Sequence, residues 1–149
     1  MKIIKRIGLI LTAIIVLFLL GIGIFLLFVP ISRSNEAVRN YVLRNIPAGT
    51  AWNDAMEIIE DKGWEVNRLN YEYGLRINDA AGNTSFATAD DLNDVLEGNN
   101  KIRIVGVKSM HIELGEYYGP LHTAVSAYLA FDENDQLVEA TVRRDIDAP

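Results

Sequence analysis

Two histidines and a glutamate are the residues whose types and spacing could bind a metal ion. His111 and Glu113 lie two positions apart, and side chains two apart on a strand share one face of a sheet. His122 falls on the next predicted strand, so two imidazoles and a carboxylate could meet, a ligand set that suits Zn²⁺. Both histidines, however, alternate against the apolar residues of their strands. The pattern therefore favours an exposed polar sheet face over a metal site.

A second polar cluster has the spacing with which a calcium-binding loop begins. Asp132, Asn134 and Gln136 alternate in the way that can place side-chain oxygens around Ca²⁺. Such a loop needs a glycine at its sixth position, where this chain has Leu137, and the glutamate required at the twelfth position is missing. We therefore interpret the stretch as a polar turn between two strands.

No other group of residues in the sequence predicts catalysis. Glu113 and Glu116 could act as an acid and a base, but nothing in their spacing holds them together. The chain has no glycine-rich phosphate loop, no serine-nucleophile motif and no HExxH motif. It contains no cysteine, which excludes thiol catalysis and thiolate zinc sites. We predict a protein that is not an enzyme and has no cofactor.

Two adjacent tyrosines are the strongest candidates for contact with another protein. Tyr117 and Tyr118 lie with His122 around residues 115–120, whose glycines and proline predict an exposed turn. Tyrosine is enriched at the energetic centres of protein interfaces. We expect Tyr117, Tyr118 and His122 to form an interface, with packing of one tyrosine in the core as the alternative.

An uncharged apolar run near the N-terminus predicts where the rest of the chain resides. Residues 7–29 form a run of 23 residues, and a helix of about 20 apolar residues crosses a bilayer core about 30 Å thick. A cleavable signal peptide would have a shorter apolar stretch and a small-x-small cleavage site, which residues 28–32 lack. A lipoprotein would need a cysteine to acylate. We therefore predict an uncleaved transmembrane helix.

The charges in front of this run predict its orientation. Lys2, Lys5 and Arg6 are clustered at the start of the chain, and clustered Lys and Arg favour the cytoplasmic side of a membrane. We therefore expect residues 1–30 to form a cytoplasmic tip and a transmembrane helix. Residues 31–149 would then form a soluble domain outside the cytoplasmic membrane.

The predicted soluble domain is strongly acidic. Residues 30–149 contain 11 Lys and Arg and 20 Asp and Glu, which gives a net charge of 11 − 20 = −9. A surface of this sign is repelled by phosphate backbones, so we predict no nucleic-acid partner. The charge is compatible with a basic protein partner but does not identify one.

Two amphipathic helices are predicted at the start of the domain. Ser34 can cap the first, whose apolar residues recur at three- and four-residue steps until Pro47 ends it. Thr50 can cap the second, which stops at Gly63. Because the link between the two is short, we expect them to pack as an antiparallel helical hairpin.

The hydrophobic period then changes to the two-residue alternation of β-strands. Strands are predicted over residues 71–77, 101–114, 121–131 and 137–144. A bulge or bend is expected near Gly106, and a Thr-x-x-Asp capping pattern predicts a short helix over residues 89–97. The order of these elements predicts an α+β fold, in which the helical hairpin packs on one face of an antiparallel sheet of about four strands.

Two short stretches carry a family resemblance. Residues 47–50 read Pro-Ala-Gly-Thr and lead into the helix that ends at residues 62–64 in Lys-Gly-Trp. Residues 128–138 read Tyr-Leu-Ala-Phe-Asp-Glu-Asn-Asp-Gln-Leu-Val. These stretches resemble the small α+β domains of the SmpA/OmlA (BamE) type, found in an outer-membrane assembly lipoprotein, and the structurally related β-lactamase inhibitor protein.

The resemblance covers about residues 34–145 and implies a helix–helix–sheet fold that binds other proteins without catalysis. The lipoprotein is held by an acylated cysteine, which this chain lacks, so a role in outer-membrane assembly is not carried over.

Together these observations predict a single-pass, membrane-anchored accessory domain. It would bind another protein outside the cytoplasmic membrane through its open sheet face or through residues 115–122. The alternative is a metal-binding protein or enzyme that uses His111, Glu113 and His122. A purely structural subunit of a membrane complex is a third possibility.

Overall fold

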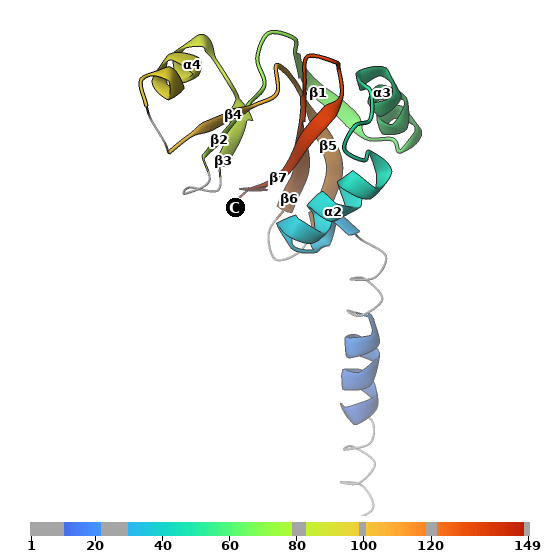
Figure 1. Cartoon of the computed structure of the whole chain (residues 1–149). Helices are drawn as coiled ribbons and strands as arrows, with labels where there is room; N and C mark the ends of the chain where they lie inside the picture. Colours follow the sequence, from blue (N-terminus) through green and yellow to red (C-terminus); the bar gives the residue numbers. More distant parts are fainter. Residues whose placement is uncertain (1–10, 22–29, 79–82, 99–100, 119–121, 148–149) are drawn as a thin grey trace, which may run out of the picture.

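The computed structural model describes residues 11–21, 30–78, 83–98, 101–118 and 122–147 (Figure 1). After the N-terminal helix the elements are η1 (Pro30–Ser32), α2 (Asn35–Asn45), α3 (Trp52–Asp61), β1 (Glu65–Asn70), β2 (Leu75–Asn78), β3 (Asn83–Phe86), α4 (Ala89–Leu96), β4 (Arg103–Val105), β5 (Lys108–Tyr118), β6 (His122–Phe131) and β7 (Leu137–Asp147). All strand pairs are antiparallel. The predicted α+β class is confirmed.

Residues 11–21 are the described part of the N-terminal helix. Their large apolar side chains are between 48% and 68% exposed, so they do not pack in the core of the domain. The other residues of the predicted span, 7–10 and 22–29, lie outside the described ranges. Among the residues that the structure describes, no helix is long and apolar enough to cross a membrane. The transmembrane helix over 7–29 stays a prediction.

Helix α2 forms as its sequence pattern predicts. The Ser34 hydroxyl accepts a hydrogen bond from the backbone N–H of Ala37 and caps the first turn. Val38, Val42 and Ile46 follow at four-residue steps, and all three are buried. Pro47 follows Ile46 and ends the helix.

Helix α3 begins later than predicted, because Thr50 does not cap it. The N-cap residue is Ala51, which makes no side-chain capping bond. The Thr50 hydroxyl instead donates to the Pro47 carbonyl at 2.7 Å. The predicted stop is confirmed, since Gly63 has a φ of 66°. The helices also differ from the tight hairpin that we expected, since α2 lies along β7 and α3 lies beside β1.

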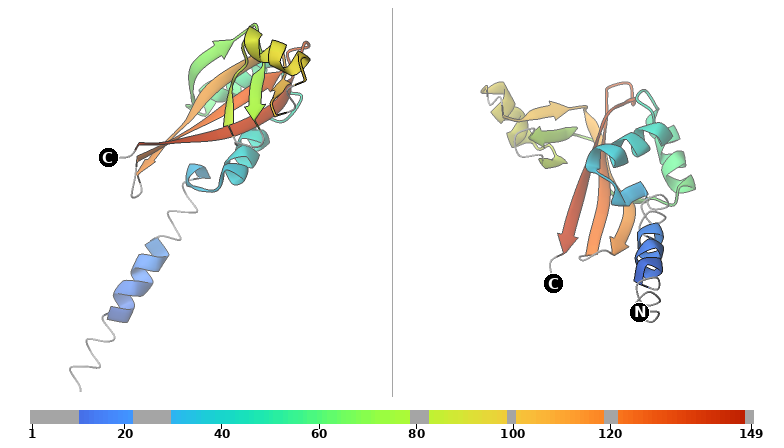
Figure 2. Two further views of the ribbon diagram at one scale, coloured as in Figure 1. Left: turned by 90° about the vertical axis from the view of Figure 1, so that its left-hand side faces the viewer. Right: turned by 90° about the horizontal axis from the view of Figure 1, so that it is seen from below.

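The main sheet has the strand order β1-β5-β6-β7, and α2 and α3 cover one of its faces. Figure 2 shows the two helices on one side of this sheet. The helix-facing core is made of buried apolar side chains from both layers, including Val42, Ile59, Ile112, Leu129 and Ala140. The predicted packing of helices on one face of a four-stranded antiparallel sheet is confirmed.

A second, three-stranded sheet of order β3-β2-β4 covers part of the opposite face. Leu75 and Ile77 of β2 pack on Tyr128 and Ala130 of β6 and form a smaller core. Helix α4 follows β3, with the predicted capping box between Thr88 and Asp91. The sequence predicted α4 but not this sheet, and the sheet face that we expected to be open is partly covered.

Two predicted strands are wrong in their bounds because the chain leaves the main sheet and returns to it. The strand expected over 71–77 begins only at Leu75, in β2, and β1 lies before it and was not predicted. The strand expected over 101–114 is divided into β4 and β5. Gly106, where we expected a bulge or bend, lies at this division with a φ of 75°. A Cβ there would lie 2.6 Å from the Phe131 carbonyl oxygen, so only glycine fits.

Gly74 lies just before β2, where the chain passes from the main sheet to the small sheet, and packs as closely. A Cβ on Gly74 would lie 2.1 Å from the Val105 carbonyl oxygen and 2.2 Å from the Gly106 carbonyl oxygen. The buried Ser109 hydroxyl donates to the Tyr73 carbonyl at 2.8 Å and joins β5 to the segment that leads into β2. The seam between the two sheets therefore depends on backbone contact at Gly74 and Gly106.

We predict that Gly74→Ala lowers the free energy of unfolding by about 2 kcal/mol or more, because backbone atoms must move to admit the methyl group. Urea titration followed by tryptophan fluorescence measures this change. Gly98→Ala is the control, because a Cβ there meets nothing within 4 Å, and its left-handed φ alone should cost about 1 kcal/mol. Equal losses in the two variants would contradict the close packing at Gly74.

Candidate functional site

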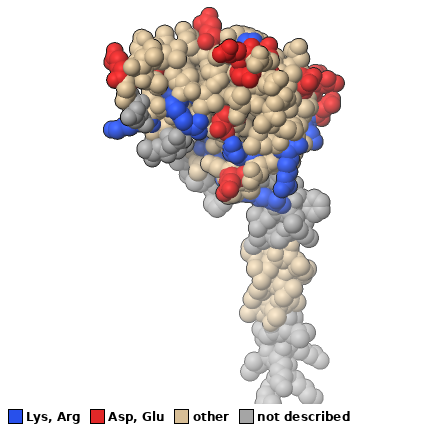
Figure 3. All heavy atoms as spheres, in the orientation of Figure 1, with Lys and Arg blue, Asp and Glu red and all other residues tan. Residues whose placement is uncertain are grey.

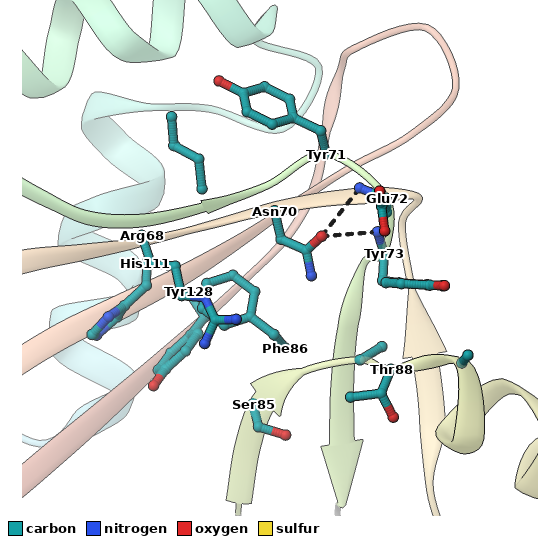
Figure 4. Close-up of a pocket in the computed structure, with 13 residues that line it drawn as sticks. Arg68, Asn70, Tyr71, Glu72, Tyr73, Ser85, Phe86, Thr88, His111 and Tyr128 are labelled. Atoms are coloured by element: carbon teal, nitrogen blue, oxygen red, sulfur yellow. Dashed lines mark hydrogen bonds between the residues drawn. The ribbon is translucent and has the colours of Figure 1, made fainter.

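A groove of about 850 Å³ lies on the face of the main sheet opposite α2 and α3, between the main and the small sheets. Its lining residues come from β1, from the connection to β2, from β3 and the start of α4, and from the middle of β5 and β6; they are Arg68, Leu69, Asn70, Tyr71, Glu72, Tyr73, Ser85, Phe86, Ala87, Thr88, Ala89, His111 and Tyr128. Residues more than 50 positions apart in the sequence therefore share one surface (Figure 4).

Four neighbouring side chains form the floor of the groove. Arg68 lies directly opposite His111, and His111 lies directly opposite Tyr128, in the registers of β1, β5 and β6. The His111 ring stacks on Tyr128 with centroids 4.4 Å apart. Phe86 meets Tyr128 edge to face at 5.8 Å, and the Arg68 guanidinium carbon lies 4.9 Å from the centroid of the Phe86 ring. We refer to these three rings and one guanidinium, from Phe86, His111, Tyr128 and Arg68, as the groove floor.

His111 is half-buried on this floor, and its environment affects its protonation. Burial lowers the pKa of His111 below its usual 6.5; the Asp145 carboxylate opposes this shift, Arg143 adds to it, and Glu113 opposes it more weakly. Its Nε2 atom is buried and has no hydrogen-bond partner among the described residues. Burial on the groove floor, where the ring stacks on Tyr128, therefore disfavours the charged form of His111.

The rim of the groove is shaped by side chains that bond to the backbone. Asn70 Oδ1 accepts hydrogen bonds from the N–H groups of Glu72 and Tyr73, at 3.1 and 3.2 Å, and turns the chain out of β1 (Figure 4). The Tyr71 ring turns away from the groove floor and packs against Trp52, with centroids 5.4 Å apart. Local turns and packing therefore shape the rim of the groove.

The structure does not bring together the three residues of the candidate metal site. His111 lies opposite Tyr128, whereas His122 lies six residues away along β6, which separates the two histidines by about 20 Å at about 3.3 Å per residue. Glu113 accepts a hydrogen bond from Asn67 at 3.1 Å, and His122 Nε2 lies 3.0 Å from Glu116. Among the described residues, no three His, Asp or Glu side chains are placed to hold a metal ion.

The calcium-like stretch is a turn, as predicted. Asp132 Oδ1 accepts hydrogen bonds from the N–H groups of Asn134 and Gln136, both at 2.9 Å, so this carboxylate caps the β6–β7 hairpin. Asp135 occupies the left-handed region with a φ of 62° and forms an ion pair with Lys108.

The candidate interface residues are placed differently from our expectation. Strand β5 continues to Tyr118, so Tyr117 and Tyr118 lie in the sheet rather than in an exposed turn. The Tyr117 side chain is half-buried and packs against the main core, which was our alternative reading for one tyrosine. The side chain of Tyr118 lies outside what the structure describes. His122 is half-buried near Glu116, and whether these residues bind a partner stays a prediction.

Sequence reasoning missed three of the four residues of the groove floor. Arg68 and Phe86 lie in β1 and β3, which were not predicted, and Tyr128 was assigned to a strand with no role of its own. Only His111 was singled out, as a metal ligand. The sequence did place His111 on the correct face of the sheet, because it alternates with the apolar residues of its strand.

Comparison of the chain with protein-family models, curated proteins and solved structures gives no match. The two stretches that carry the family resemblance do lie side by side. The Gly49 N–H donates to the Leu137 carbonyl at 2.8 Å, and the Leu137 N–H donates to the Thr50 carbonyl at 2.9 Å. The SmpA/OmlA (BamE) resemblance itself stays a prediction.

We predict that the wild-type chain loses more stability on acidification than His111→Gln does. The pKa of His111 is lower in the folded state than its usual 6.5, so the unfolded chain binds more protons and folding weakens as the pH falls through and below 6.5. Urea titrations at pH 8 and pH 5 measure the difference. The slope of the free energy of unfolding against urea concentration should be the same for both chains. An equal loss of stability in the two chains between pH 8 and pH 5 would contradict the lowered pKa of His111.

Proposed function

We propose that this chain is a single-pass, membrane-anchored accessory protein whose domain binds another protein outside the cytoplasmic membrane, without catalysing a reaction. The observation that carries the proposal is the groove of about 850 Å³ between the two sheets. Aromatic residues and arginine are enriched at the energetic centres of protein interfaces, and both kinds make up the groove floor. The preformed rim lowers the ordering cost of binding.

The arrangement of polar groups supports binding rather than catalysis. A general base needs a proton donor within hydrogen-bond reach and usually a third group that orients it. His111 Nε2 has no hydrogen-bond partner in the described part of the chain. Asn70 and Thr88 hold backbone N–H groups at the rim. The alternative function, a metal-binding protein or enzyme using His111, Glu113 and His122, is disfavoured by the separation of the two histidines along β6.

The N-terminal helix supports the membrane anchor. Its described residues are uncharged and, apart from Thr12, apolar, and Leu17 and Phe18 are each 68% exposed. A helix that is apolar on nearly all sides needs an apolar environment. Figure 3 shows Lys and Arg gathered on the side of the domain that adjoins this helix, and Arg33 and Arg44 are exposed. Long basic side chains next to the end of a membrane-spanning helix can extend to the lipid headgroups.

We predict that a photo-crosslinking amino acid at Ser85, inside the groove, captures a partner protein in native membranes. The same group at Lys62, an exposed residue at the end of α3, is the matched control and should give no such adduct. A Glu72→Trp substitution at the rim should reduce capture from Ser85 because it narrows the groove. Mass spectrometry of the adducts is the readout. Capture from Lys62 alone would contradict a partner in the groove.

We predict that the chain resists extraction by alkaline carbonate and that its domain is accessible from outside the cell. Because the chain has no cysteine, Glu133→Cys on the exposed β6–β7 turn provides a single labelling site. A membrane-impermeant maleimide should label it in intact cells or spheroplasts, with the cysteine-free parent as the control. Labelling only after lysis would reverse the orientation, and release by carbonate would exclude the anchor.

A further inference from the structure

The groove is bordered by the edges of two strands. Ser85 and Phe86 are neighbours on β3 and point to opposite faces of their sheet, yet both line the groove, so the backbone edge of β3 must face it. Strand β3 is one of the two edge strands of the order β3-β2-β4, and β1 is one of the two edge strands of the main sheet. An exposed strand edge presents N–H and C=O groups that can pair with an added strand.

The two edges are not equally suited to an added strand. The β1–β5 register shifts between Val66 and Arg68, and an irregularity of this kind interrupts a ladder. Strand β3 has an uninterrupted register with β2 and reads Asn-Thr-Ser-Phe, without charge or proline. Its four residues make a short edge, which limits an added strand to a few hydrogen bonds, but no charge, proline or bulge blocks pairing along them. The edge of β3 is therefore the better template.

Arg68 supplies a charge on the groove floor that the described residues do not neutralise. Its guanidinium lies over the Phe86 ring, and no described carboxylate is paired with it. A guanidinium stacked on a ring keeps its N–H groups available at its edge, where a carboxylate binds them two at a time. His111 lies directly opposite Arg68 and borders the same position on the groove floor.

We infer that the groove binds an extended acidic segment of the partner protein, which adds to the edge of β3 and places an Asp or Glu carboxylate on Arg68. The inference rests on the proposed function, because it specifies the chemistry of the partner at the same groove. Main-chain pairing with β3 provides affinity, and the side-chain position over Arg68 provides selectivity.

The acidic net charge of the domain does not prevent this contact. Of the 20 Asp and Glu, only Glu72 among those that the structure describes lines the groove, and exposed charges elsewhere are screened over a Debye length of about 8 Å at physiological ionic strength. Contact with Arg68 is short-range and partly desolvated, so it decides the preference at that position. Elsewhere on the surface an acidic segment is weakly repelled, which restricts its binding to the groove.

Selection of displayed random nonapeptides on the full chain in detergent micelles tests this inference. Peptides enriched on the wild-type chain should carry Asp or Glu at one fixed position. Their other preferred residues should recur at every second position, as on a strand. Enrichment of that acidic position should be lost on Arg68→Gln and kept on Arg44→Gln, a control on α2 at the opposite face of the sheet. Circular dichroism confirms that each variant is folded.

A double-mutant cycle with one selected peptide then identifies the contact. Changing its acidic residue to the amide should weaken binding about tenfold or more, Arg68→Gln should weaken it equally, and the two changes together should cost little more than either alone. N-methylation of the peptide at alternate residues should abolish binding in one parity and spare it in the other, as strand addition requires.

The outcomes separate this inference from the proposed function. Selected peptides without an acidic preference that still compete with capture from Ser85 would overturn the acidic segment and leave protein binding intact. Basic peptides enriched in the groove, or N-methylation without parity, would overturn it likewise. If no peptide is enriched over an empty micelle, the inference is wrong, whereas the proposed function is decided by crosslinking at Ser85.

Discussion

Every residue from Val125 to Phe131 in β6 is buried, although neighbouring side chains on a strand point to opposite faces of the sheet. Burial on both faces requires two covering layers. Ala127, Leu129 and Phe131 pack in the core beneath α2 and α3, and Tyr128 and Ala130 pack beneath the small sheet. The rest of the fold follows from this strand, because each layer supplies one of its two covers.

The helix layer is tied to the end of β6 by backbone pairing. The β6–β7 hairpin, capped by Asp132, receives the chain entering α3: the Trp52 N–H donates to the Asp135 carbonyl at 2.8 Å, and residues 49 and 50 pair with Leu137. These bonds replace the capping of α3 by Thr50. They also explain why residues 47–50 and the β6–β7 turn, which are far apart in the sequence, form one structural unit.

The small sheet covers the other face only in part, and the groove is what it leaves uncovered. Close backbone contacts at Gly74 and Gly106 fix where the chain leaves and rejoins the main sheet. The aromatic rings of Phe86 and Tyr128 then meet at the junction of the two layers, with Arg68 and His111 beside them. A binding surface thus arises where two layers meet, rather than from any one loop or motif.

The sequence by itself determined the elements whose signals are local. The apolar stripe and cap of α2, the stop at Gly63, the capping box of α4, the polar turn after Phe131 and the α+β class all depend on residues near one another in the chain. Tertiary structure alone decided the division of the strand predicted over 101–114 between two sheets, the pairing of β1 with β5 and of β3 with β2, and the assembly of Arg68, Phe86, His111 and Tyr128. The physical reason is that period and capping report local conformation, whereas the second cover of β6 depends on pairing between segments far apart in the sequence, which no local pattern encodes.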